Sequence, residues 1–295
     1  MPWKRELSLW TPTIVAFLIL ADEASWYWTN IPEMQFGWMI PVLGGYLIFE
    51  AWETRSKVVA RWTWGSFVLT IVGCVSMFVT QIYQAAYGVT AASLSGAGLG
   101  FVAVSFGNFL YLYGWKGLRN FGFGVCFMML AVPIPPMINS AIVGALQEFV
   151  ATVTVEILAL LGVPAELQGS LVRLPTGLLG VNEACSGIRS LQSTVMATLF
   201  IGHLVLRYKS TQLLLFICGV SLAILGNLTR VFFLSYSASK YGIEAVDTAH
   251  DAAGWTILLV TVTGVGVISW SFGKLEHRLA FSNIPAVEDS EILNP

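Results

Sequence analysis

The sequence predicts an all-α membrane protein: a polytopic helical bundle of about eight transmembrane helices with one further helix at the interface. Hydrophobic residues make up 56% of the 295 residues and charged residues only 11%, with a mean hydropathy of +0.74. That charge is too sparse to cover a water-exposed surface. Apolar runs of about twenty residues recur, and each can cross about 30 Å of hydrocarbon as a helix. The formal charge of −2 offers no basic face for nucleic acid.

Hydropathy places the membrane spans, and the basic residues orient them. The predicted spans are 8–27, 36–52, 63–85, 93–114, 120–139, 185–206, 211–236 and 252–273. If the N-terminus is cytoplasmic, most of the 15 Lys and Arg residues fall on the cytoplasmic side: Lys4, Arg5, Arg55, Lys57, Arg61, Lys116, Arg119, Arg207, Lys209, Lys274 and Arg278. This distribution follows the positive-inside rule. An even number of spans also returns the C-terminus to the cytoplasm.

The stretch 140–162 is apolar enough to suggest a ninth span, but Glu148 and Glu156 interrupt it. A ninth crossing would place the rest of the chain on the wrong side for its basic residues. We therefore expect a helix near the outer surface. The prolines in Pro133-Ile-Pro135-Pro136 end the fifth span, because proline removes a backbone donor and restricts the residue before it. Residues 165–184 are expected to form a short hairpin or loop.

Three chemically active residues are predicted to lie at one extracytoplasmic level. Arg230 is 19 residues beyond Thr211, which is about 28 Å along a helix from its cytoplasmic end. His250 precedes the last span and Cys185 begins an earlier one, and basic residues close both spans on the inside. Ionisable groups in membrane helices are costly, so their presence favours a functional role.

A thiol, an imidazole and a guanidinium at one level are the groups that nucleophilic acyl transfer needs. A helix N-terminus would favour the Cys185 thiolate, and His250 would accept the thiol proton and return it to a leaving amine. Arg230 would hold the oxyanion of a tetrahedral intermediate. Arg189, four residues after Cys185 and on the same helix face, is the other candidate for that role.

Simpler interpretations remain open for each of these residues. Cys185 could be a small apolar residue at a helix end, an outer arginine could reach toward lipid headgroups, and His250 with Asp251 could cap a helix. Two other functions also stay open: an anion transporter that uses Arg230 and Arg189, and a non-catalytic component of a membrane assembly. The other cysteines, which lie in apolar runs without metal-ligand spacing, are Cys74, Cys126 and Cys218. We expect neither a metal site nor a cofactor.

Three segments together resemble the exosortase/archaeosortase family of membrane cysteine transpeptidases. They are Asn182-Glu-Ala-Cys-Ser-Gly-Ile-Arg-Ser190, Asn227-Leu-Thr-Arg230 and His250-Asp-Ala-Ala-Gly254. Their order and wide spacing match the family, in which a Cys, a later Arg and a His that opens the final helix recur. The resemblance implies catalytic Cys185, Arg230 and His250, with Arg189 as a further match.

The resemblance also implies a substrate class and a location. Its substrates would be secreted proteins with a C-terminal sorting signal, which is a short motif such as Pro-Glu-Pro, a transmembrane helix and a basic tail. The partners would be these proteins, membrane lipid and an amine acceptor, at the outer side of the cell's inner (cytoplasmic) membrane. Residues 1–282 would form a single integral-membrane catalytic domain, followed by a disordered cytoplasmic tail at 283–295. Four flanking residues are candidates for substrate binding or an accessory role: Asn182, Glu183, Asn227 and Asp247.

Overall fold

The computed structural model describes the chain except residues 1–5, 7, 181–186, 243 and 283–295. Side chains are also left out at residues 180, 244–251 and 280–282. The chain divides into two compact units, Met1–Val143 and Gly144–Pro295, which are treated separately. The expected tail at 283–295 lies outside the described residues.

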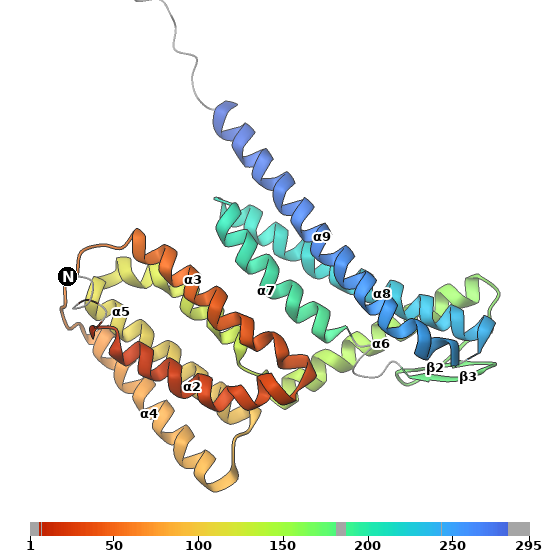
Figure 1. Cartoon of the computed structure of the whole chain (residues 1–295), viewed down its shortest axis with the longest axis horizontal. Helices are drawn as coiled ribbons and strands as arrows, with labels where there is room; N and C mark the ends of the chain where they lie inside the picture. Colours follow the sequence, from red (N-terminus) through yellow and green to blue (C-terminus); the bar gives the residue numbers. More distant parts are fainter. Residues whose placement is uncertain (1–5, 7, 181–186, 243, 283–295) are drawn as a thin grey trace, which may run out of the picture. The chain divides into compact units, whose positions relative to one another are not determined.

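The first unit is built from helices around α5 (Figure 1). Its elements are α2 (Thr11–Asn30), the 3-10 helix η1 (Pro32–Trp38), α3 (Met39–Glu53), α4 (Trp64–Tyr87), α5 (Ala91–Met128) and the 3-10 helix η2 (Met129–Ala131). Thr63 and Thr90 each cap the helix that follows, with capping boxes completed by Ser66 and Ser93. These caps satisfy backbone donors that would otherwise be orphaned at the start of α4 and α5.

Helix α5 is a hairpin of two antiparallel arms that turns at Gly114. Gly114 has φ +66° and ψ −159°, a backbone conformation that glycine adopts without strain. The Phe109 and Phe121 rings stack with centroids 4.6 Å apart, whereas a straight helix would separate them by about 18 Å. Near the open end, the Ser95 hydroxyl donates to the Pro133 carbonyl at 3.2 Å. The arms correspond to the predicted spans 93–114 and 120–139.

The second arm ends earlier than the sequence predicts. Helical structure stops at Ala131 rather than at residue 139, and α6 (Pro136–Leu160) begins with the proline that follows. The reason is local, because the prolines deprive the helix of backbone donors while Pro136 suits a first helical turn. Residues 136–139 thus belong to the next helix.

The second unit contains α6 from Gly144 onward, a small sheet and three long helices. The antiparallel sheet has the order β1 (Glu166–Gln168), β2 (Leu171–Leu174) and β3 (Gly177–Gly180), so the expected hairpin is present. Buried Val172 and Leu174 of β2 join a core cluster with residues of α6 and α8. The Thr176 hydroxyl also donates to the Ala238 carbonyl at 3.0 Å. The sheet is thereby fixed to the C-terminal part of α8.

Helices α7 (Ile188–Val205), α8 (Lys209–Tyr241) and α9 (Glu244–Ser282) form an antiparallel group (Figure 1). A Cβ on Gly219 of α8 would lie 2.4 Å from Thr198 of α7, and one on Gly226 would lie 2.9 Å from Ile257 of α9. Because glycine has no side chain, the helix backbones approach closely at these two points, as is common between membrane helices.

Five helices in the described part of the chain are long and apolar enough to cross a membrane, when the α5 hairpin is counted once. They are Trp64–Tyr87, Ala91–Ala131, Pro136–Leu160, Lys209–Tyr241 and Ala252–Leu279. The fold class predicted from the sequence, an all-α polytopic membrane bundle, is confirmed. Because α6 is among the five, the interfacial position expected for 140–162 stays a prediction.

Candidate active site

Helix α8 carries two polar side chains one turn apart, in the middle of an apolar sequence. Asn227 is buried, with 4% of its surface exposed, and Arg230 is half-buried. Residues three apart lie on neighbouring positions of one helix face. This face of α8 contacts both neighbouring helices, α7 and α9, through one glycine on each side.

The first contact joins α8 to α9. An added Cβ on Gly254 would lie 3.4 Å from Nη2 and 3.6 Å from Cζ of Arg230. The guanidinium therefore rests against the backbone of α9 at a position without a side chain. His250 lies four residues earlier in the same helix, which is the next turn of that face. The His250 side chain itself is outside the described part of the structure.

The second contact joins α8 to the start of α7. Gly187 precedes the helix with φ +77°, and an added Cβ there would lie 2.6 Å from Cγ and 2.8 Å from Nδ2 of Asn227. Only glycine fits both the left-handed backbone and the close amide. The Ser190 hydroxyl donates to the Gly187 carbonyl at 2.8 Å and stabilises the first turn. Gly187 is two residues beyond Cys185 in the sequence.

Both contact residues lie far along their helices from a basic end. Arg230 lies 21 residues after Lys209, the first residue of α8, which is about 32 Å along the helix. Gly254 lies 20 residues before Lys274 in the antiparallel α9, or about 30 Å. Each distance matches one hydrocarbon thickness. Arg230 and Gly254 are therefore both a membrane span away from the basic ends of their helices.

The structure places some of the predicted site residues and leaves others out. Cys185, Asn182 and Glu183 lie outside the described residues, and so does the side chain of Asp247. Arg189 is exposed in the first turn of α7. In the described part of the chain, no three His, Cys, Asp or Glu residues gather closely enough to hold a metal ion.

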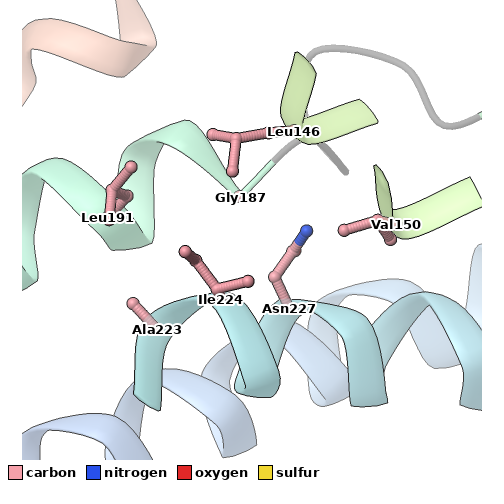
Figure 2. A pocket seen from close by; sticks show the side chains of 7 residues that line it. All are labelled: Leu146, Val150, Gly187, Leu191, Ala223, Ile224 and Asn227. Atoms are coloured by element: carbon pink, nitrogen blue, oxygen red, sulfur yellow. The ribbon is translucent and has the colours of Figure 1, made fainter. Parts of the chain in front are cut away.

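A small pocket adjoins Asn227, between α6, α7 and α8 (Figure 2). The Asn227 side chain points from α8 into the space between Gly187 and Val150. The cavity volume is about 10 Å³, room for roughly one water molecule. Its lining consists of Leu146, Val150, Gly187, Leu191, Ala223, Ile224 and Asn227.

The opposite end of the three helices is fastened by a buried carboxylate that the sequence did not single out. Glu276 of α9, 5% exposed, accepts hydrogen bonds from the backbone N–H groups of Arg207 at 2.8 Å and Tyr208 at 3.2 Å, and from the Thr211 hydroxyl. It satisfies donors where the chain turns from α7 into α8. Its place among Lys274, His277 and Arg278 is typical of a solvated helix end, so the sequence gives no signal of this contact.

A bundle of membrane-spanning helices that brings an arginine, a buried amide and two contact glycines to one end defines a multi-pass integral membrane protein with a polar site. The family model described as Transmembrane exosortase (Exosortase_EpsH) matches residues 28–267. The chain belongs to this family. The match includes all of α7 and α8 and the part of α9 that bears His250 and Gly254. No curated protein and no solved structure matches the chain.

Proposed function

We propose that this protein is a membrane cysteine peptidase or transpeptidase whose catalytic residues are Cys185, Arg230 and His250. The supporting observation is that one face of α8 contacts both the start of α7, which follows Cys185, and the part of α9 that carries His250. Arg230 contacts Gly254, one helical turn from His250, and Asn227 contacts Gly187, two residues from Cys185. Two residues of extended chain span at most about 7 Å. Family membership is the second support.

Each of the three groups has a defined task in the proposed reaction. His250 takes the proton of the Cys185 thiol, and the thiolate attacks the scissile carbonyl carbon. Arg230 stabilises the negative charge on the carbonyl oxygen of the tetrahedral intermediate. When the C–N bond breaks, His250 gives its proton to the departing amine, and a thioester on Cys185 remains. His250 then accepts a proton from water or an amine, whose attack releases Cys185 and forms an acid or an amide.

The proposed substrates are secreted proteins with a C-terminal motif, a transmembrane helix and a basic tail. A site one hydrocarbon thickness from the basic ends of α8 and α9 suits a peptide bond just outside the membrane. The substrate helix would lie beside the bundle in the inner membrane, with both termini of the enzyme in the cytoplasm. The acceptor is either water or an amine on a lipid or polymer.

The accessory residues have supporting roles in this proposal. Arg189, in the first turn of α7, adds positive charge near the thiolate. Asp247, three residues before His250 on α9, orients the imidazole. Asn182 and Glu183 shape the site on the other side of Cys185.

The deciding experiment is co-expression with a reporter that carries a C-terminal sorting signal, followed by intact mass spectrometry. Wild type and Cys185→Ala are compared with Cys218→Ala, which removes a half-buried free thiol of α8. We expect cleavage by wild type and Cys218→Ala and none by Cys185→Ala. His250→Gln should likewise be inactive, while His203→Gln in α7 stays active. Equal cleavage by Cys185→Ala and wild type would refute the assignment. The product mass distinguishes water from a larger acceptor.

A further inference from the structure

The pocket between α6, α7 and α8 has no part in the catalytic steps described above, yet it lies between the segments that supply them. Gly187 forms part of its wall two residues beyond Cys185, and Asn227 lines it one helical turn before Arg230. Figure 2 shows the Asn227 amide directed into this space. A peptide bond held between Cys185 and Arg230 would therefore have the pocket beside it.

We infer that this pocket receives one substrate side chain next to the scissile bond and restricts that position to glycine, alanine or serine. The inference rests on the proposed function. Its first support is size, because a cavity of about 10 Å³ holds roughly one water molecule or a group of similar volume. A methyl or hydroxymethyl side chain fits, whereas valine or leucine requires the walls to move.

The second support is the chemistry of the walls. Leu146 and Val150 of α6, Leu191 of α7 and Ala223 and Ile224 of α8 give an aliphatic surface, and the lining in the described structure includes no charged side chain. A charged substrate group would lose its hydration there without a partner, at a large cost. The Asn227 amide has both donor and acceptor atoms, so it suits the hydroxyl of serine.

The walls also show how the preference can be changed. Ile224→Ala enlarges the pocket from α8, and Leu146→Ala enlarges it from α6. Ala223→Leu fills it, since Ala223 is buried with 2% exposed. Leu225 is the matched control, because it follows Ile224 on α8 but is 57% exposed and is not part of the lining. Leu225→Ala removes the same kind of side chain without altering the pocket.

The test uses a library of the membrane-anchored reporter, randomised at the residues preceding its transmembrane helix and cleaved in cells by the full-length enzyme. We expect wild type to accept only glycine, alanine and serine at one position. Ile224→Ala and Leu146→Ala should each raise the cleavage of valine relative to alanine there by about tenfold, the effect of fitting one or two methylenes. Ala223→Leu should shift the preference to glycine, and Leu225→Ala should match wild type.

Two results would overturn the inference alone: Cys185-dependent cleavage with no position limited to small residues, or such a position unchanged in both enlarged variants. Cleavage of the alanine reporter shows that each variant is folded, and the two enlarging changes lie on different helices, so one misfolded variant leaves the other as the test. Cleavage by Cys185→Ala, or none by wild type on any library member, would refute the proposed function and this inference together.

Discussion

The guanidinium of Arg230 lies against Gly254, where an added Cβ would be 3.4 Å from Nη2. This separation is ordinary van der Waals contact, so a methyl group fits and a larger side chain does not. The contact sets the position of the Arg230 guanidinium within the interface between α8 and α9.

Larger side chains at Gly254 should therefore displace the guanidinium and impair cleavage. Gly254→Ala should change kcat/KM little, whereas Gly254→Leu should lower it by about 100-fold, as a displacement of about 1 Å at a reacting centre does. Gly266→Leu is the control in the same helix, because an added Cβ at Gly266 meets nothing within 4 Å. Reporter cleavage rates measure the effect, and equal losses at the two positions would contradict the role of this contact.

Gly187 is predicted to tolerate no side chain at all. Its φ of +77° makes alanine unfavourable by roughly 1–2 kcal/mol, and the Cβ would also overlap the Asn227 amide. Gly242→Ala carries the backbone cost alone, since Gly242 has φ +88° and open space around it. We expect Gly187→Ala to lower the melting temperature more than Gly242→Ala. Combining it with Asn227→Ala should recover part of the excess, because the Cβ of residue 227 would still lie 2.9 Å from the added methyl group. Additive losses would show that the two residues do not interact.

Glu276 is predicted to be a stabilising residue distant from the chemistry. Glu276→Ala leaves two backbone N–H groups without their acceptor, which should cost about 2–4 kcal/mol of folding free energy. The Thr211 hydroxyl keeps the Tyr208 carbonyl, at 2.8 Å, as its other acceptor. Thr211→Val should cost less, because it removes one of the three hydrogen bonds. Melting temperatures in detergent measure both losses. Cleavage below the melting temperature should persist, and its loss with an unchanged melting temperature would refute this assignment.

The N-terminal unit should lose stability in acid through Glu6. The Arg55 guanidinium donates to both Glu6 carboxylate oxygens, at 2.6 and 2.8 Å, and this bond holds the pKa of Glu6 below its usual value of 4.5. The Tyr113 hydroxyl, which donates at 2.7 Å, lowers the pKa further against the effect of burial. A lowered pKa gives stability that is present above about pH 4.5 and is lost as the pH falls through the folded-state value.

Melting curves between pH 7 and pH 3 test this dependence. Wild type should melt above Glu6→Gln at neutral pH, and the difference should shrink as the pH drops below about 4.5. Glu148→Gln is the control, since Glu148 is exposed on α6. A constant difference between wild type and Glu6→Gln across the range would contradict the linkage.

Much of the fold follows from the sequence because its determinants are local. The basic residues Lys116 and Arg119 predict a turn between two spans, and the structure reverses the chain beside them at Gly114. The prolines at 133–136 end one helix and begin the next. Hydropathy predicts the position of the sheet less well. Val172 and Leu174 of the sheet are buried by residues of α6 and α8 that are distant in the sequence.

For the site, charge and helix rise predict depth but give no information about rotation around each helix axis. Arg230 faces α9 and Asn227 faces Gly187 because of how the helices pack. At both contacts a glycine, which has no side chain, leaves room for the polar group. Gly187 and Gly254 lie within the segments that carry the family resemblance, yet their contacts emerge only in three dimensions. Glu276 was missed for the same reason, because its partners are backbone groups more than 60 residues away.

The length of α8 would hold the site of the proposed enzyme at a fixed height relative to the membrane. Its 33 residues extend about 50 Å, well beyond the roughly 30 Å of hydrocarbon, and Arg230 marks the point on it where the hydrocarbon would end. A substrate anchored by its own helix would present its motif at the level of Arg230. Its cleavage point would then depend on height above the membrane as well as on sequence. Lengthening the linker between motif and anchor would move a correct motif away from the level of Arg230 and reduce its cleavage.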